Sequence, residues 1–258
     1  EIKVDLSELK KTNSREIKRH PWELARLEVV LKLMNPFLKK ENFMLDIGCG
    51  DLFFLEALNN KGVNGQFHAV DIAFSGEQIT YFKERYKEKP FEVYQNLDAF
   101  DDSISQPASV VLLLDVIEHI ENDIDFLKDL VIRKCISDDT LFFITVPAYQ
   151  YLFCEHDVLL GHYRRYTNGM LKRHIEESGL EVVKLGYFFF TLFLARNIEK
   201  LRNNDRDKTD IAGWNGGKFI TSLIKNVLIL DAMVMFVFQK LGIKLPGLSN
   251  YVICRKKR

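Results

Sequence analysis

Short apolar runs alternate with amphipathic segments between residues 40 and 150. The run at 108–116 is nearly continuous in apolar residues, which is typical of a central parallel strand covered on both faces. The predicted strands lie at 43–48, 66–72, 91–97, 108–116 and 140–147. Segments with helical spacing lie between them, at 52–62, 76–89 and 122–135. This alternation predicts an α/β fold with a doubly wound, mostly parallel sheet.

The two ends of the chain depart from this alternation. Residues 1–40 have helical spacing, and Pro36 marks the end of the predicted helix. After Pro147 the sequence predicts an irregular polar and aromatic stretch at 148–170, a helix at 170–179, a strand at 180–188, a polar linker at 197–217, an apolar helix at 218–241 and a short strand at 251–258.

Composition narrows the class of protein. The 258 residues include 36 basic and 36 acidic side chains, and 47% are apolar, which excludes a disordered chain. Zero net charge argues against a nucleic-acid binder that works by bulk electrostatics. The four cysteines form no C-x-x-C pair, so zinc ligation is not expected, and their low density fits the reducing cytoplasm. The first residues, EIKVDLSELKK, do not resemble a signal peptide.

The C-terminal apolar segment raises the question of membrane contact. The strongest candidate for a membrane-spanning helix, 219–238, is interrupted by Lys225, Asn226 and Asp231, so we expect no transmembrane helix. Apolar residues recur there at three- and four-residue spacing: Phe219, Leu223, Val227, Leu230, Val234 and Phe238. Core packing or a dimer interface is the favoured interpretation of this stripe. A surface for a lipid tail, or peripheral membrane contact aided by the basic tail at 255–258, is the alternative.

The segment LDIGCGD, residues 45–51, carries the strongest chemical signal. A strand leads into a turn with Gly48 and Gly50, where the missing Cβ atoms let a ligand approach the main chain. The segment is not a P-loop, and Phe53 interrupts a dinucleotide G-x-G-x-x-G pattern. Cys49 is interpreted as a small filler and not as a nucleophile. Asp71, at the end of the next strand, can accept hydrogen bonds from both hydroxyls of a ribose.

Acidic residues stand at or near four predicted strand ends. The segments LDIGCGD, AVDI and LDVIEHI resemble motifs of class I S-adenosylmethionine (SAM)-dependent methyltransferases, and the resemblance covers about residues 40–150. The resemblance implies SAM as cofactor and a seven-stranded sheet whose last, antiparallel strand inserts near the sheet's end. The implied donor-binding residues are Asp46, Gly48, Cys49, Gly50, Asp71, Ile72, Leu97, Asp98, Asp115 and Val116. Asp98 as a simple turn cap is the alternative.

The segment DVIEHI places a carboxylate beside an imidazole, which can act as a general base. Asp115, Glu118 and His119 fall at i, i+3 and i+4, and with His156 or His162 this set could hold a divalent metal. The set is similar to the metal motif of small-RNA ribose methyltransferases and ubiquinone-pathway O-methyltransferases. Asp115 replaces their first glutamate, however, and the Glu-His pair also occurs in methyltransferases without metal. We therefore expect no metal.

The segment CEHDVLLGHYRRYT, residues 154–167, gathers polar groups on the expected substrate side. The predicted substrate-binding residues are His156, Asp157, Arg164, Arg165 and Tyr166. The two neighbouring guanidinium groups suit a phosphate or carboxylate. A solvated basic loop capped by Thr167 is the alternative. This segment resembles a bacterial methyltransferase subgroup linked to surface-glycan or polyprenyl-sugar pathways.

RHPWELAR, residues 19–26, also resembles this subgroup, which tends to carry an aromatic residue at the position of Pro21. Trp22 either packs over the donor site or anchors the first helix to the sheet.

The sequence therefore predicts a cytoplasmic methyltransferase that acts on an oxygen of a small or lipid-linked, anionic acceptor, with His119 or His162 as base beside Glu118. The expected parts are a helical flap at 1–40, a SAM-binding catalytic domain at 41–196 and 245–258, and a helical lid at 197–244. A metal-assisted RNA 2′-O-methyltransferase and a SAM-binding protein without turnover are the alternatives. A nicotinamide oxidoreductase is disfavoured by the loop after Gly50. The sequence leaves the acceptor and the oligomeric state open.

Overall fold

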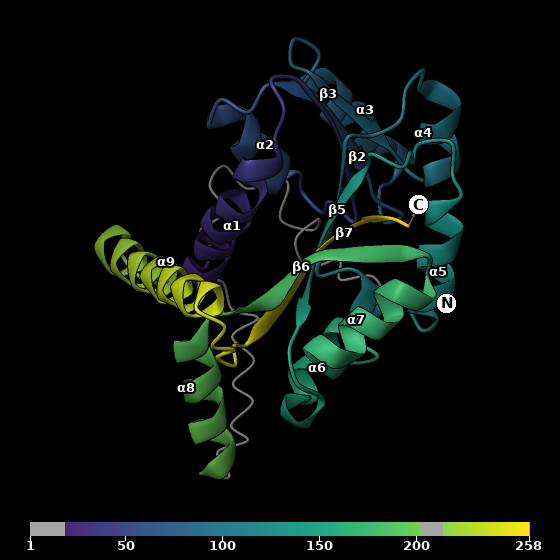
Figure 1. The fold of residues 1–258 in the computed structure, drawn as a ribbon. Coiled ribbons are helices and arrows are strands. Elements are labelled where there is room, and N and C mark those ends of the chain that lie inside the picture. Colours follow the sequence, from purple (N-terminus) through teal and green to yellow (C-terminus); the bar gives the residue numbers. More distant parts are fainter. Residues whose placement is uncertain (1–18, 203–213, 258) are drawn as a thin grey trace.

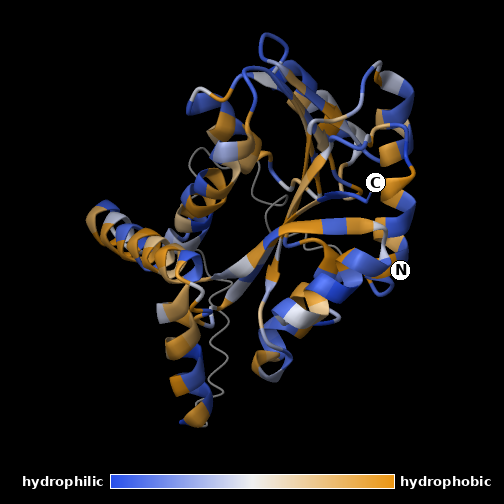
Figure 2. Ribbon diagram, in the orientation of Figure 1, coloured by the Kyte–Doolittle hydropathy of each residue, from blue (hydrophilic) through white to orange (hydrophobic). Residues whose placement is uncertain are grey.

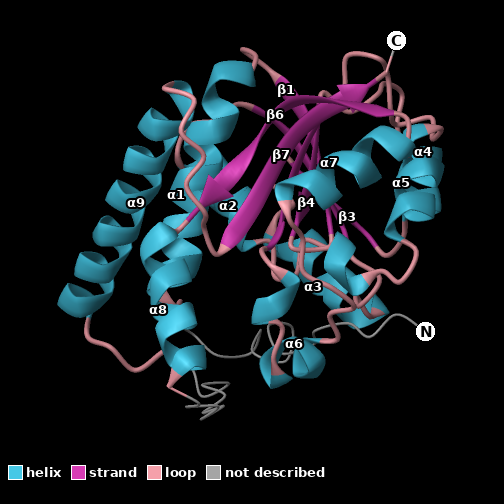
Figure 3. Ribbon diagram, turned by 60° about the horizontal axis from the view of Figure 1, so that its bottom comes forward, coloured by secondary structure: helices cyan, strands magenta, loops and turns pink. Residues whose placement is uncertain are grey.

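The protein is built on a seven-stranded sheet in the order β3-β2-β1-β4-β5-β7-β6 (Figures 1 and 3). The structure, a computed structural model, describes residues 19–202 and 214–257. The strands are β1 (Asn42–Ile47), β2 (Gly65–Val70), β3 (Phe91–Tyr94), β4 (Val110–Leu114), β5 (Leu141–Pro147), β6 (Leu180–Phe188) and β7 (Ser249–Lys256). Only β7 runs antiparallel to its neighbours, which confirms the predicted fold class and the inserted last strand.

Helices cover both faces of the sheet. They are α1 (Pro21–Met34), α2 (Phe53–Asn60), α3 (Gly76–Arg85), α4 (Leu97–Ser103), α5 (Asp123–Val131), α6 (Glu155–Leu160), α7 (Asn168–Glu177), α8 (Phe190–Leu201) and α9 (Lys218–Lys240). Side chains of α1, α2, α3 and α9 share one hydrophobic core with one face of the sheet. Side chains of α4, α5 and α7 share a second core with the other face. The sheet is thus buried between two layers of helices.

The first helix agrees with its prediction in the described residues. Pro21 occupies its first turn, the His20 side chain accepts a hydrogen bond from the Trp22 amide, and the helix ends at Met34, before Pro36. The rest of the predicted flap, residues 1–18, and most of the polar linker, 203–213, lie outside the described residues.

Three helices are not where the sequence suggested. The third strand was expected to reach residue 97, but it ends at Tyr94, because Asn96 caps α4 by accepting a hydrogen bond from the Ala99 amide. Asn96, and not Asp98, is therefore the capping residue there. Helix α6 lies in the stretch expected to be irregular, and α8 begins inside an apolar run that continues from β6 across the left-handed residue Phe189.

Helix α9 packs through a different face from the one that its apolar spacing suggested. Its buried residues are Leu228, Ala232 and Met235, and the helix contacts α1 and β6. The predicted stripe is instead largely exposed, with Phe219 80% and Leu230 65% exposed, so the expectation that it packs in the core is wrong. By length and composition α9 is also the one helix among the described residues that could span a membrane, with mean hydropathy 1.9.

This packing predicts opposite outcomes for two leucines in α9. Leu228 is buried against the α1 side of the core, so Leu228→Ala should lower the free energy of unfolding by about 2–5 kcal/mol. Leu230→Ala, on the exposed face of the same helix, should change it by no more than about 0.5 kcal/mol. Urea unfolding followed by circular dichroism measures both values. Equal losses would contradict the orientation of α9.

Candidate active site

Unusual backbone conformations gather at the carboxyl edge of the sheet. Among the described residues, four that are not glycine have positive φ angles, and each follows a strand end by five residues or fewer: Leu52, Asp115, Tyr149 and Phe189, with φ of 57–68°. Left-handed backbone costs energy for side chains with a Cβ atom, and it persists where surrounding contacts impose it. The chain is therefore held in forced turns as it leaves β1, β4, β5 and β6.

The loop after β1 is tied to the end of β2. Gly48 and Gly50 have φ of 71° and 56°, and a Cβ atom on Gly48 would lie 2.8 Å from a methyl group of Val116. The Asp71 carboxylate accepts hydrogen bonds of 2.9 Å from the amides of Gly50 and Ala73. Three sequence-predicted segments thus meet here, and the exposed main chain of Gly48 is open to a ligand.

Burial makes the acids of this loop weak. Burial, with the nearby Asp71 charge, raises the pKa of Asp46 to about 8, and burial also raises the pKa of Asp71. Burial and these two carboxylates raise the pKa of the Cys49 thiol well above its usual value. A protonated thiol is a poor nucleophile, which agrees with the interpretation of Cys49 as a filler. At Asp46 burial outweighs the nearby Arg26 charge, and at Asp71 it outweighs the two amide hydrogen bonds.

Helix α1 and the residue Arg19 that precedes it are joined to the same edge by two ion pairs that the sequence did not reveal. Arg26 pairs with Asp115, and Arg19 pairs with Asp51. The hydroxyl of Thr145 also donates to Asp115, at 2.9 Å. The guanidinium of Arg26 lies over the Trp22 ring, 5.1 Å from its centroid. Because each pair joins residues far apart in sequence, no local pattern indicates it.

The implied donor-binding residues Ile72, Leu97 and Asp98 are less closely grouped. Asp98 is exposed and forms an ion pair of 2.8 Å with Arg133, which also binds Asp101. Ile72, directly after Asp71, is 51% exposed, which is unusual for a large apolar side chain next to a buried acid. Leu97 is half-buried against the second core. Of these residues, Ile72 offers an apolar surface next to the glycine loop.

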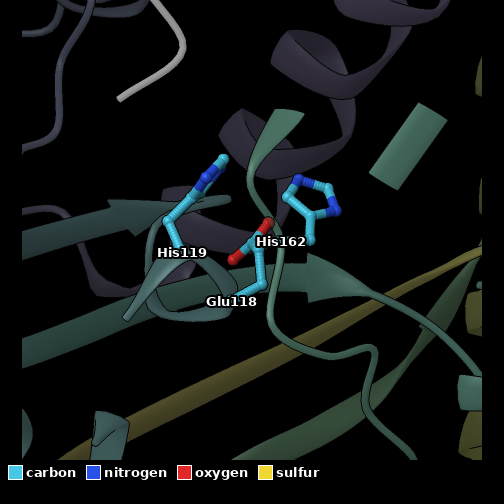
Figure 4. Close-up of side chains that lie close together, drawn as sticks. All are labelled: Glu118, His119 and His162. Carbon is cyan, nitrogen blue, oxygen red and sulfur yellow. The ribbon is translucent and has the colours of Figure 1, made fainter. Parts of the chain in front are cut away.

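Beyond β4, Glu118, His119 and His162 converge, as Figure 4 shows. Each offers a ligand atom within 4.8 Å of those of the other two, and the imidazole rings of the two histidines lie 4.6 Å apart between centroids. The Glu118 side chain is fully buried, and neither carboxylate oxygen has a hydrogen-bond partner among the described residues. Burial raises its pKa to about 8. A buried, unpartnered carboxylate is costly in a fold, so it points to a function.

Asp157 orients one member of this cluster. Its buried carboxylate lies 2.7 Å from Nδ1 of His162, and it accepts hydrogen bonds from Nε of Arg165 and the amide of Cys154. These hydrogen bonds and the Arg165 charge outweigh burial and hold the pKa of Asp157 below its usual value. With Nδ1 engaged, Nε2 is the nitrogen of His162 that remains for chemistry.

The structure corrects part of the predicted substrate segment. Tyr166 is fully buried, and its hydroxyl donates to Asp123 at 2.6 Å, so it has no surface with which to contact a substrate. The two arginines are already neutralised, because Arg164 pairs with Asp123 and Arg165 pairs with Asp157, both at 2.8 Å. The segment is therefore neither a free anion site nor a solvated loop.

At the end of this segment, Thr167 caps α7 by accepting a hydrogen bond from the Met170 amide, which was expected only in the alternative interpretation of the segment. His156 is exposed on α6.

Comparison with known proteins gives a consistent result. Residues 19–185, more than half of the chain, match the family model described as a methyltransferase domain. Coclaurine N-methyltransferase bound to N-methylheliamine and SAH is 19% identical, with a TM-score of 0.55 over 91% of this chain and 70% of that chain. A SAM dependent methyltransferase from Archaeoglobus fulgidus is 19% identical, with a TM-score of 0.51 over 97% and 98%. The methyltransferase domain of bacterial CtHen1-C is 14% identical, with a TM-score of 0.54 over 92% and 99%. No curated protein matches the chain.

The buried carboxyl of Glu118 predicts a specific dependence of stability on pH. Its pKa is about 8 in the folded protein and near 4.5 in an unfolded chain, so the folded state binds this proton more tightly. The stabilisation is fully present below about pH 4.5 and is lost as the pH rises through about 8. As the pH rises from about 5 to about 8, the free energy of unfolding should therefore decrease less in Glu118→Gln than in the wild type. Urea titrations at several pH values measure this difference.

The control is Glu92→Gln, which changes an exposed glutamate on β3 and should follow the wild type. An unchanged pH dependence in Glu118→Gln would show that the Glu118 carboxyl titrates normally.

Proposed function

Because the chain belongs to the methyltransferase domain family, we propose that it transfers a methyl group from SAM to an oxygen atom of a small or lipid-linked acceptor. The observation that carries this proposal is the glycine loop fixed to Asp71 next to the buried acid Asp46. In this arrangement, exposed main chain lies beside two buried acids whose pKa values are raised. A ligand with positive charge and a ribose suits both features.

The residues at the edge fit the parts of such a donor. The main chain of Gly48 and Gly50 admits the methionine portion, and ionisation of Asp46 is favoured by a nearby positive charge. The Asp71 carboxylate accepts two amide hydrogen bonds and keeps further lone pairs for ribose hydroxyls. Ile72 provides an exposed apolar surface for the adenine. Asp98 is paired with Arg133, so its carboxylate is already engaged within the protein.

Donor binding should depend on Gly48 because a side chain at this position would take up space, and not only because of its left-handed backbone. Gly48→Ala would bring a methyl group within 2.8 Å of Val116 and into the path of the donor, so SAM affinity should fall at least tenfold. Calorimetric titration with SAM and SAH, with NAD as the unrelated ligand, measures this effect. For the wild type, SAM at about 100 times its dissociation constant should stabilise the fold by about 2.7 kcal/mol.

Gly62→Ala is the matched control. Gly62 has a similar φ of 81°, but nothing lies within 4 Å of the added methyl group. This variant should therefore bind SAM as the wild type does. Binding of neither SAM nor SAH to folded wild-type protein would overturn the proposed function.

The chemistry at the acceptor follows from the Asp157–His162 pair. When bound, SAM supplies an electrophilic methyl group that is displaced from sulfur in line with the attacking oxygen. Nε2 of His162 takes the proton from the acceptor hydroxyl, and Asp157 stabilises the resulting imidazolium through Nδ1. His119 lies beside this ring and is the alternative base. Arg164 and Arg165 offer no uncompensated charge to an anionic acceptor, because Asp123 and Asp157 pair with them.

Removal of the base should separate turnover from donor binding. His162→Ala should lower kcat by about 100-fold or more, which is the usual contribution of a general base, while the Kd for SAM changes little. Turnover is read from SAH release with a panel of hydroxylated small molecules and polyprenyl-linked sugars. A large loss of SAM affinity in this variant would instead make His162 a structural residue.

A second candidate function is metal-assisted 2′-O-methylation of RNA, which the cluster of Glu118, His119 and His162 favours. Two imidazoles and a carboxylate are common ligands of divalent transition metals, and the contact between Asp157 and Nδ1 of His162 is typical of metal-bound histidines. Here the three side chains would hold the ion, which would polarise the ribose hydroxyl. EDTA abolishes turnover under this function but leaves it unchanged if His162 acts as a base. RNA binding would also weaken steeply with salt.

A further inference from the structure

Helices α8 and α9 carry apolar faces that no other described part of the chain covers. Large exposed apolar residues recur every three or four positions along α9 and at the residue that caps its end: Phe219, Leu223, Val227, Leu230, Val234, Val237 and Leu241. Leu194, Ile198 and Leu201 continue the exposed apolar surface on α8, and Leu201 is 85% exposed. Figure 2 shows both helices projecting from the sheet at one corner, largely in the apolar colour. Exposed apolar surface of this extent marks an interaction site.

The charge of this corner differs from that of the whole chain. The described residues 190–202 and 214–244 contain seven basic and two acidic side chains, whereas the full sequence is balanced at 36 of each. Exposed lysines stand at both ends of the α9 stripe, Lys218 at one end and Lys240 and Lys244 at the other. Both acids are engaged within the protein: Glu199 pairs with Arg196, and Asp231 accepts hydrogen bonds from Thr191.

We propose that the exposed faces of α8 and α9 dock on the surface of an anionic lipid bilayer, with α9 lying in the plane of the interface. An apolar helix face flanked by lysines is the combination that binds such interfaces, since apolar side chains enter the acyl region and ammonium groups contact phosphates. This inference concerns lipid binding alone and does not require that the chain methylate a lipid.

A second copy of the chain fits this surface less well. The apolar spacing along α9 would suit a helical pair, but such pairs are usually stabilised by opposite charges beside the seam. The only charges on α9 other than Asp231 are Lys218, Lys225 and Lys240, and the carboxylate of Asp231 is held by Thr191. Two facing copies of α9 would therefore bring lysines together without acids to pair with them.

A membrane-spanning α9 would require loss of contacts that the structure contains. Leu228, Ala232 and Met235 are buried in the protein's own core. The Gln239 amide donates to the Tyr187 carbonyl and accepts from the Tyr251 hydroxyl, both at 2.8 Å, which fastens the helix to β6 and β7. A helix bound along one side in this way can present only its other side to lipid.

The proposed lipid-facing corner is continuous with the acceptor side of the candidate active site. On α8, Arg196 donates to the sulfur of Cys154 at 2.8 Å, and Asn197 accepts from the Tyr151 hydroxyl at 3.0 Å. The ring of Phe193 packs 5.1 Å from that of Tyr149. This contacted segment leads directly into α6 and His162. A molecule anchored in the bilayer would therefore approach the cluster from the side of α8.

Flotation with lipid vesicles tests the proposal without SAM or any acceptor, so its outcome is independent of the methyltransferase function. The full chain should float with vesicles of phosphatidylcholine and phosphatidylglycerol, bind pure phosphatidylcholine far less, and be released by high salt or alkaline carbonate. Leu230→Glu should weaken binding at least tenfold, since one buried leucine contributes about that factor. Lys240→Gln and Lys244→Gln should each weaken it about fivefold.

Two matched variants control for nonspecific effects. Ile132→Glu changes a side chain that is 79% exposed at the end of α5, on the other face of the sheet, and Lys128→Gln removes an exposed charge from α5. Both should bind vesicles as the wild type does. Circular dichroism and thermal unfolding confirm that the variants are folded.

Three outcomes overturn the proposal. The first is equal binding by Leu230→Glu and the wild type, or no binding by either. The second is retention of the protein on vesicles after alkaline carbonate, which indicates a spanning helix. The third is a wild-type dimer that Leu230→Glu converts into a monomer, with no vesicle binding, which assigns the surface to a second copy of the chain.

Discussion

Because six strands run in the same direction, the candidate site residues gather at one edge of the sheet. β1 to β6 all run the same way, so their carboxyl ends meet, and the chain must turn sharply as it leaves several of them. Asp115 and Tyr149 make these turns in the left-handed region, which costs on the order of 1–2 kcal/mol for each residue with a Cβ atom. The cost is tolerated because hydrogen bonds and ion pairs hold the turns, such as the contacts of Asp115 with Thr145 and Arg26. Placement of the cluster beyond β4 depends on these forced turns.

Buried acids divide into two groups with different roles. Asp123 and Asp157 each pair with several donors and fix the side chains around them. At Asp46 and Glu118 burial outweighs the charges of nearby arginines, and it raises their pKa values. A structure built only for stability would pair or replace such groups. The contrast distinguishes the acids that hold neighbouring side chains in place from the acids at which we propose that a ligand binds.

The sequence predicted the features that depend on local pattern. Strand and helix alternation predicted the doubly wound, mostly parallel sheet, and the glycine spacing located the loop that meets Asp71. Features that depend on residues far apart in the sequence were either not predicted or predicted wrongly. The ion pair between Arg26 and Asp115 joins segments that no periodicity connects. Tyr166 lies in a segment whose residue types suggested a binding surface, yet its hydroxyl satisfies a buried acid. Apolar spacing likewise identifies α9 as a helix with an apolar face but cannot decide which face meets the core.

The position of β7 has a consequence for how the protein is made. In the sheet β7 separates β5 from β6, but along the chain it follows both of them and the α8–α9 segment. During synthesis on the ribosome, β5 and β6 therefore emerge with an unfilled space between them, and each presents unpaired backbone groups toward it. Vectorial folding cannot close this gap, because the strand that fills it is translated after the apolar helix α9. The nascent chain thus exposes an open sheet edge and the apolar helix α9 at the same time. In this state, chaperones or a nearby bilayer would protect it from aggregation.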